Sequence, residues 1–285
     1  MTLTAVQASI YLHHLAFESA NPEKLAMFYS STMQMGCSKI SEVEWRCEGP
    51  RRRMVFVPGE NKKMAYAGMA CRDNDGLESL RARAIYENIK VSQSVSPYFE
   101  PGAFSISDPD GNVILFGVAI PEVEQSNSIK GPLQHLTFAS YDVERFRDFY
   151  HGKLGFRLTD RVLHKDGSLA TCFTTSNHEH HTIACFKSNR QGVDHHSYEA
   201  GDWNYIRDWC DHFSSKNIKL MWGPGRHGPG NNLFIFIEDP DGNWIEVSAE
   251  LETVYDRPVK DWPQAERTLN PVSYTHLTLP TSYAV

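Results

Sequence analysis

Hydrophobic and polar positions follow a regular order in the second half of the chain, and they predict one strand, one helix and three further strands. An apolar run at 133–139 predicts the first strand. The helix is expected to begin after Asp142, a good N-cap residue, because apolar side chains then recur on one helical face. These side chains are Val143, Phe146, Phe149 and Tyr150. Alternating strands are expected at about 156–163, 168–175 and 180–187.

The same order of elements then begins again. A strand is expected at 193–199, and Asp202 is the next candidate N-cap. The helix that follows carries Trp203, Ile206, Trp209 and Cys210. Strands are expected near 218–222, 232–238 and 243–248, with Asp-Pro-Asp-Gly-Asn as a tight turn. The second half therefore contains a βαβββ unit twice.

The first half of the chain repeats short motifs of the second half. "YLHHLAF" from Tyr11 matches "PLQHLTF" from Pro132, so that His14 and His135 lie 121 positions apart. The turn Asp-Pro-Asp-Gly-Asn occurs at 108–112 and again at 239–243. This repetition predicts an α+β fold in which four βαβββ modules form two tandem cup-like domains, with the concave face of each cup open to a ligand.

The repeat also sets the expected domain boundaries. We expect an N-terminal domain at 1–120, a C-terminal domain at 131–252 and a C-terminal extension at 253–285. The two domains are joined by a polar stretch, "PEVEQSNSIKG". The last fifteen residues are rich in Thr, Ser and Pro and follow the closed repeat, so we expect a disordered or non-native tail.

Composition excludes several classes of protein. Hydrophobic residues make up 41% of the 285 residues, which supports a buried core and excludes a disordered chain. The net charge of −7 argues against nucleic acid as a partner. The sequence has neither an apolar run of roughly 18 residues nor a signal sequence, so a cytoplasmic protein without a membrane partner is expected. The six cysteines form no Cys-x-x-Cys pair and are expected to be free thiols.

A candidate metal site follows from side chains that the strands can direct into the second cup. Alternate residues of a strand face the same side, so His135, His196 and Glu246 can all face one cavity. Two imidazoles and one carboxylate are typical of non-haem Fe(II) oxygenases. The equivalent positions of the first half are His14, Ala67 and Leu115. Only one ligand remains there, so the N-terminal domain is expected to be non-catalytic. A single buried histidine is more often a hydrogen-bonded core residue, and the hypothesis depends on all three side chains together.

Four motifs carry a resemblance to a known family: "QHLTF", "HHTIACF", "VDHHSYEA" and "GPGRHGPGNNLFIFIEDPDGNWIEV". In this order they resemble the vicinal oxygen chelate superfamily, and specifically its two-domain type I extradiol ring-cleavage dioxygenases. The resemblance covers nearly all of residues 8–250. It implies Fe(II), less often Mn(II), bound by His135, His196 and Glu246, with an aromatic diol and O₂ as substrates. It also implies His181 as the acid–base residue, His227 as a contact of the substrate oxygen, and a homo-oligomeric assembly.

The expected substrate pocket departs from the family at one position. The family usually has a tyrosine ten residues before the glutamate ligand, whereas this chain has Phe236. Asn231 and Asn232 are candidates to replace the missing hydroxyl group. The aromatic residues Phe173, Phe186, Trp222, Phe234 and Phe236 lie on or beside the inner strands and suit a hydrophobic ring, although each could equally be core packing. Strand alternation directs the neighbouring His180 and His195 away from the cup, and we expect them to be structural.

Two further functions stay open. The same scaffold could carry another metal-dependent enzyme, such as a glyoxalase-like isomerase or lyase. Alternatively, the cup could bind an aromatic compound or antibiotic without catalysis, in which case no metal would be needed.

Overall fold

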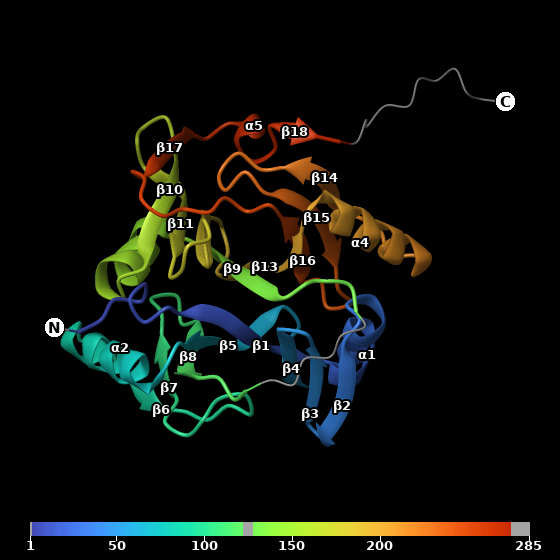
Figure 1. Ribbon diagram of the computed structural model, residues 1–285, viewed down its shortest axis with the longest axis horizontal. Helices are drawn as coiled ribbons and strands as arrows, with labels where there is room; N and C mark the ends of the chain where they lie inside the picture. Colours follow the sequence, from blue (N-terminus) through green and yellow to red (C-terminus); the bar gives the residue numbers. More distant parts are fainter. Residues whose placement is uncertain (1, 122–127, 275–285) are drawn as a thin grey trace.

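The computed structural model describes residues 2–121 and 128–274, and two β-sheets dominate it, one from each half of the chain (Figure 1). The elements of the first half are β1 (Tyr11–Ser19), α1 (Pro22–Thr32), β2 (Gly36–Ser41), β3 (Glu44–Gly49), β4 (Arg52–Pro58), β5 (Lys63–Cys71), α2 (Asn74–Tyr86), β6 (Ser92–Gln93), β7 (Phe104–Ser107) and β8 (Val113–Val118). Within the described residues they give a sheet of eight strands in the order β2-β3-β4-β1-β5-β8-β7-β6.

The second half has the same plan with additions at both edges of its sheet. Its elements are β9 (Leu133–Ser140), α3 (Val143–Arg147), the π-helix η1 (Asp148–Lys153), β10 (Arg157–Leu163), β11 (Leu169–Thr175), β12 (Ile183–Lys187), β13 (Gly192–Gly201), α4 (Trp203–Ser215), β14 (Trp222–Arg226), β15 (Leu233–Glu238), β16 (Trp244–Ala249), β17 (Lys260–Pro263), α5 (Glu266–Leu269) and β18 (Val272–Ser273). The strand order is β17-β10-β11-β12-β9-β13-β16-β15-β14-β18.

The predicted fold class is confirmed, because the element order gives four βαβββ modules in two tandem sheets. Asp142 and Asp202 are the N-caps of α3 and α4, and each side chain accepts a backbone N–H of the first turn. The strand expected near 218–222 lies instead at 222–226, where Gly225 pairs with Phe234 of β15. Glycines carry no alternating side chains, so the hydrophobic pattern did not indicate a strand there.

The register of the three inner strands decides which side chains share a face of the second sheet. His135 of β9 lies opposite Ser197 of β13, and Ser197 lies opposite Glu246 of β16. Residues that are directly opposite in a sheet project to the same side. His135, Ser197 and Glu246 therefore face one side together with His195, two residues before Ser197, while His196 faces the other side.

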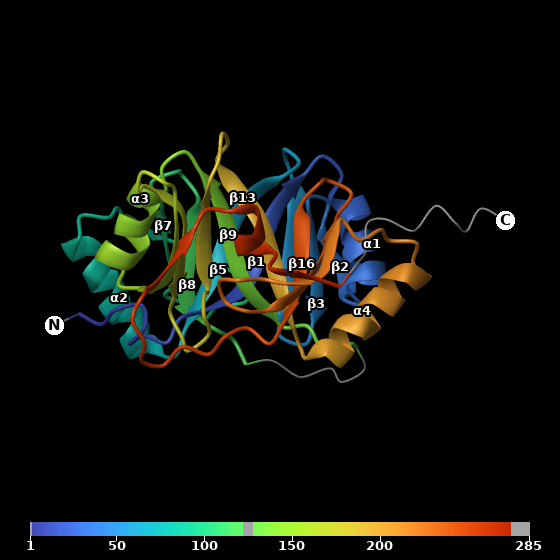
Figure 2. The same ribbon diagram turned by 90° about the horizontal axis from the view of Figure 1, so that it is seen from above.

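The two halves pack with their helices side by side at the two ends of the molecule (Figure 2). At one end, His212 of α4 donates through Nε2 to the carbonyl oxygen of Thr32 in α1 at 3.0 Å. At the other end, the Arg83 side chain of α2 donates to the carbonyl of Lys153 in η1. The domain boundaries expected from the sequence remain a prediction, and residues 122–127 of the expected linker lie outside the described residues.

The C-terminal extension is part of the second sheet as far as the structure describes it. Strand β17 pairs in parallel with β10, and β18 pairs with β14, so the extension adds one strand to each edge. Figure 1 shows it crossing the side of the sheet remote from the first half. The expected disordered tail began at Pro271, but Val272–Ser273 form β18; positions 275–285 lie outside the described residues. No helix among the described residues is long and apolar enough to cross a membrane.

The expectation of six free cysteines is wrong for one pair. Cys37 and Cys47 lie directly opposite on the antiparallel strands β2 and β3, and their sulfurs form a disulfide. The chain spacing of ten residues gave no indication of this contact, because it arises from strand pairing. The other four cysteines, Cys71, Cys172, Cys185 and Cys210, are free.

Candidate metal centre

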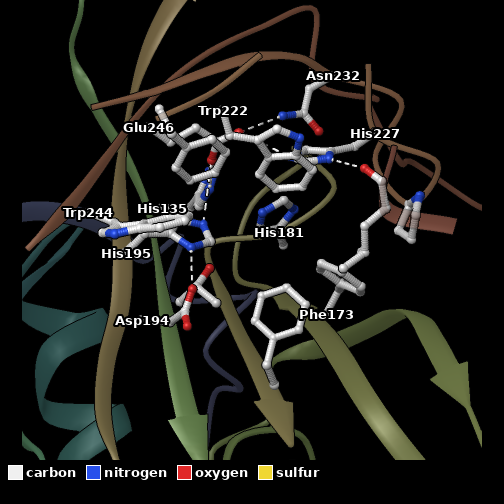
Figure 3. Close-up of a pocket in the computed structure, with 15 residues that line it drawn as sticks. His135, Phe173, His181, Asp194, His195, Trp222, His227, Asn232, Trp244 and Glu246 are labelled. Carbon is white, nitrogen blue, oxygen red and sulfur yellow. Dashed lines mark hydrogen bonds and ion pairs between the residues drawn. The ribbon is translucent and has the colours of Figure 1, made fainter. Parts of the chain in front are cut away.

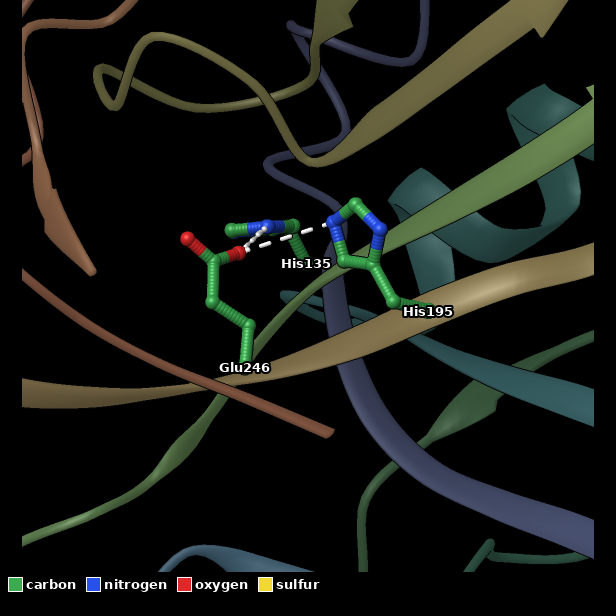
Figure 4. A group of neighbouring side chains, drawn as sticks. All are labelled: His135, His195 and Glu246. Atoms are coloured by element: carbon green, nitrogen blue, oxygen red, sulfur yellow. Dashed lines mark hydrogen bonds and ion pairs between the residues drawn. The ribbon is translucent and has the colours of Figure 1, made fainter. Parts of the chain in front are cut away.

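Three side chains from three adjacent strands converge at the floor of the second cup (Figure 4). His135, His195 and Glu246 each offer one ligand atom, and these atoms lie within 4.8 Å of one another. Nε2 of His135 is 2.9 Å and Nε2 of His195 is 3.5 Å from Oε2 of Glu246. All three residues are buried. Two imidazoles and one carboxylate in this arrangement form the facial set that suits a divalent transition metal.

The sequence hypothesis named His196 in place of His195, and the structure corrects it. His196 faces the first half of the chain, where its Nε2 lies 3.1 Å from the Tyr29 hydroxyl oxygen. Its ring also lies 5.4 Å from the ring of Phe17. Strand alternation places His195 and His196 on opposite faces of the sheet, but it does not say which face lines the cavity. The pairing of Ser197 with Glu246 decides this in favour of His195.

A spacing within the sequence could have found the right histidine. In "HLTF", His135 precedes the aromatic Phe138 by three positions, and His195 precedes Tyr198 in the same way. Phe138 and Tyr198 are both fully buried on the opposite face of the sheet. An odd spacing places the histidine and the aromatic ring on opposite faces of a strand, so this motif fixes the direction of the histidine.

The protonation states of the cluster suit a cation. Burial alone would raise the pKa of Glu246, but His135, His227 and His195 hold it well below its ordinary range. Burial lowers the pKa of His135 against the attraction of Glu246. The pair therefore consists of a carboxylate and a neutral imidazole, which are the forms that bind metal ions.

Two neighbours orient these ligands. Nδ1 of His195 lies 2.9 Å from Oδ1 of Asp194, and although burial lowers the pKa of His195, the Asp194 carboxylate raises it above its ordinary value. A proton on Nδ1 leaves Nε2 of His195 with its lone pair toward the cluster. Asn232 donates through Nδ2 to Oε1 of Glu246 at 3.1 Å and to Oγ of Ser248 at 2.9 Å. Such support is typical of metal ligands, and the residues present therefore fit a divalent metal ion.

A cavity of about 240 Å³ opens above the cluster (Figure 3). The lining includes the predicted residues His135, Phe173, His181, Phe186, Trp222, His227, Asn232, Phe236 and Glu246. It also includes Thr137, Asp194, Pro229, Trp244 and Leu269, which the sequence hypothesis did not name, and His195, which was expected to point away from the cup and does not. Thr137 and Trp244 could have been found, since each lies two positions from a ligand on the same strand face.

The two candidate catalytic histidines flank the cluster. The ring centroid of His181 is 4.2 Å from that of His135, and burial lowers the pKa of His181 well below its ordinary value. Nε2 of His227 is 3.5 Å from Oε1 of Glu246, while its Nδ1 lies 2.5 Å from the Leu269 carbonyl oxygen. Because a carbonyl only accepts, Nδ1 of His227 carries the proton.

Other predicted positions differ in their placement. Asn231 is exposed and does not line the cavity, whereas Asn232 is buried and bonds Glu246. Phe234 lies behind the cavity wall, with its ring stacked on His227 at 3.9 Å. His180 does not line the cavity, as expected, and its Nε2 lies 3.2 Å from Oδ2 of the buried Asp160.

The described part of the first half shows no equivalent site. The register places His14, Gly68 and Leu115 where the second half has His135, Ser197 and Glu246. Tyr66 then occupies the position of His195, and its ring centroid lies 5.6 Å from that of His14. Nε2 of His14 already bonds Oγ of Ser96 at 2.8 Å. No carboxylate reaches His14 there among the contacts described, and its ring occupies the space that a side chain at position 68 would need.

The fold of four βαβββ modules and the candidate metal site are those expected from the resemblance stated above. Comparison with known sequences agrees with that resemblance. Residues 133–247 match the family described as "Glyoxalase/Bleomycin resistance protein/Dioxygenase superfamily". Metapyrocatechase 2 of Cupriavidus necator is 24% identical over 241 residues, which cover 76% of this chain and 72% of that protein. The resemblance to two-domain type I extradiol dioxygenases is thereby confirmed.

Solved structures share the fold over most of its length. Homoprotocatechuate 2,3-dioxygenase from Arthrobacter globiformis superposes with a TM-score of 0.80 at 19% identity, covering 92% of this chain and 87% of that one. A Mn(II)-bound glyoxalase from Novosphingobium aromaticivorans gives a TM-score of 0.80 at 18% identity, covering 95% and 91%. The fold therefore accommodates both classes of enzyme that the sequence left open.

Proposed function

We propose that the chain is a metal-dependent extradiol dioxygenase that opens the aromatic ring of a catechol-type substrate with O₂. The metal is Fe(II), held by His135, His195 and Glu246, with Mn(II) as the alternative. The observation that carries this proposal is the convergence of these three buried ligands on the floor of a cavity lined by aromatic rings and two further histidines. When bound at these residues, Fe(II) would supply the redox chemistry for the reaction of the diol with O₂.

The protein's own residues bind and orient the substrate and move its protons. His181 is a neutral imidazole beside His135 and can take a proton from a diol hydroxyl group. His227 is held by the Leu269 carbonyl with its other ring nitrogen toward the cluster, where it can contact a substrate oxygen. The wall of aromatic rings excludes water from the reacting groups.

A pair of adjacent histidines gives a sharp test. The His195→Ala variant should retain less than about a tenth of the iron after anaerobic reconstitution, because it removes one of three ligands. The His196→Ala variant should keep its iron and lose only stability, roughly 1–3 kcal/mol, since it leaves the buried Tyr29 hydroxyl with one partner fewer. Metal content is measured on both purified proteins, and O₂ uptake with catechols is recorded with the wild type.

Two results would contradict the proposal. Full iron content in His195→Ala, or loss of iron only in His196→Ala, would remove the ligand assignment. Bound metal without O₂ uptake for any catechol would instead favour a glyoxalase-like enzyme, which the shared fold also permits. The expected homo-oligomer remains a prediction, and it is measured by light scattering on the same sample.

A further inference from the structure

The titratable side chains on the wall of the cavity above the metal site are carboxylates and histidines. Among the residues that the structure describes, neither a lysine nor an arginine lines it. The charged groups that do line it are the carboxylates of Glu246 and Asp194. The histidines gather at the metal end, where His227, His135 and His195 all lie within 3.5 Å of Glu246.

Away from the metal end, the wall is apolar on two sides. Phe173 and Phe186 come from β11 and β12, and their ring centroids are 6.2 Å apart in an edge-to-face arrangement. On the other side, Trp222 and Phe236 stack with centroids 5.3 Å apart. Leu269 of the C-terminal extension also contributes to the wall. A substituent on the substrate ring therefore meets hydrocarbon and aromatic faces.

The arginine beside this region is already engaged. Arg190 lines a separate hollow behind Asp194, which it shares with Lys62. Its guanidinium donates to the Val193 carbonyl at 2.9 Å and lies 3.3 Å from the Asp194 carboxylate. Asp194 itself is held by His195 at 2.9 Å. An anionic group inside the cavity would thus meet the Asp194 carboxylate before it reached Arg190.

We infer that the substrate is an uncharged catechol with a short apolar ring substituent, and that the cavity rejects catechols with a carboxylate substituent; this rests on the proposed function. A buried carboxylate without a cation or a set of hydrogen-bond donors is strongly disfavoured, whereas an alkyl group gains from leaving water. The volume of about 240 Å³ is near the lower end for small-molecule sites, roughly 300 Å³, and suits one ring with a small substituent.

A matched pair of ligands tests this selectivity. 4-Ethylcatechol and 3,4-dihydroxyphenylacetate differ in that a methyl group replaces a carboxylate at the end of the side chain. Both are titrated anaerobically into the full-length, Fe(II)-loaded protein by calorimetry, with unsubstituted catechol as reference. The expected dissociation constant is at least about 100-fold lower for 4-ethylcatechol than for the anionic ligand, and about fivefold lower than for catechol.

A second test changes the protein and not the ligand, by placing a lysine on the apolar wall. Leu269 and Phe186 are half-buried, so a lysine at either position can direct its ammonium group toward the substituent. In the Leu269→Lys variant, the ratio of the dissociation constant of 3,4-dihydroxyphenylacetate to that of 4-ethylcatechol should fall at least tenfold. The matched control, Leu269→Met, should leave this ratio unchanged. The Phe186→Lys variant repeats the test from the opposite wall if the first variant folds poorly.

Each outcome bears on the inference separately from the proposed function. Equal or tighter binding of 3,4-dihydroxyphenylacetate overturns the inference, while O₂ uptake with that ligand would leave the dioxygenase proposal standing. The expected selectivity without O₂ uptake supports the inference and contradicts the dioxygenase. Failure of all three diols to bind overturns both.

Discussion

The adjacent His180 and His181 form a buried pair that can set the proton position of the candidate acid–base residue. Their Nδ1 atoms are 2.9 Å apart, so one ring donates to the other. Nε2 of His180 lies 3.2 Å from the fully buried Asp160 carboxylate. A carboxylate at Nε2 favours the His180 tautomer that carries its proton there. His180 then accepts from Nδ1–H of His181, and Nε2 of His181 becomes the basic nitrogen.

We therefore expect the His180→Gln variant to lower kcat roughly ten- to hundredfold, because His181 loses the partner that fixes its tautomer. The dissociation constant of the diol and the iron content should stay unchanged, since neither depends on His180. Steady-state kinetics with parallel metal analysis measures all three quantities. The exposed His178 supplies the control, His178→Gln. A loss of activity that merely follows a loss of iron would refute the positioning role.

At the level of single residues, the sequence predicted the chemistry better than the exact positions. His135, Glu246, His181 and His227 were named and lie around one cavity. His196 was wrong because two adjacent histidines satisfy the same alternation, and only the pairing of Ser197 with both His135 and Glu246 distinguishes them. Leu269 could not have been named, since it reaches the cavity through an extension far along the chain.

At the scale of elements, the C-terminal extension connects the sheet edge to the cavity above His135, His195 and Glu246. Asp160 of β10 accepts from the Arg257 guanidinium at 2.8 Å and from the Trp262 indole N–H at 2.6 Å. Further along, the Thr268 carbonyl accepts from Gly228 N at 3.1 Å, and the next carbonyl, of Leu269, accepts from His227. The extension therefore holds one candidate catalytic histidine through its backbone.

The Trp262→Ala variant should loosen this extension. It removes the hydrogen bond to Asp160 and the contacts with the cluster around Phe173 and Phe186, at a cost of roughly 1–3 kcal/mol. We expect faster amide exchange across 260–269 and a raised KM, because His227 loses its carbonyl partner. Hydrogen–deuterium exchange read by mass spectrometry measures the first effect. Tyr205→Ala, on the outer face of α4, is the control. Unchanged exchange in this segment would show that Trp262 does not anchor it.

Elements with strong periodicity were predictable, and short edge elements were not. The expected strands at 156–163 and 168–175 lie within one or two residues of β10 and β11. Strands β17 and β18 have four and two residues, which is too short for an alternating pattern. Their pairing comes from the edges that the second sheet offers, so only the three-dimensional structure reveals it.

At the scale of the molecule, the repeated Asp-Pro-Asp-Gly-Asn turns join the two halves reciprocally. Asp239 of the second half accepts from the Tyr29 hydroxyl of the first half at 3.3 Å. Asp108 of the first half accepts from the Tyr150 hydroxyl of the second half at 3.2 Å. The sequence indicated both repeats but not this exchange, because a repeat gives equivalent positions and does not give the contacts between its copies. Among the described residues the first cup shows no equivalent set of metal ligands, but it has the same turn and tyrosine, which contact the other half.

The Asp239 carboxyl should make the stability of this interface depend on pH. Burial raises its pKa to about 6, against hydrogen bonds from Asn243 and Asp241 that lower it. In the unfolded chain an aspartate titrates near 3.9, so between about pH 4 and pH 6 the folded state binds more protons than the unfolded state. The contribution of Asp239 to the free energy of unfolding therefore decreases as pH rises through that window, by roughly 2–3 kcal/mol in total.

The Asp239→Asn variant should remove this dependence, because an amide keeps an oxygen for the backbone N–H groups of Asp241 and Asn243 but does not titrate. Urea unfolding of both proteins at several pH values between 4 and 7 gives their free energies of unfolding. As pH rises, the free energy of unfolding of the wild type should decrease relative to that of the variant. Asp208→Asn, which changes a half-buried aspartate of α4 that pairs with Arg207, is the control. A constant difference across the pH range would mean that Asp239 is already ionised when it accepts the Tyr29 hydroxyl, and that the interface has adapted to a buried charge.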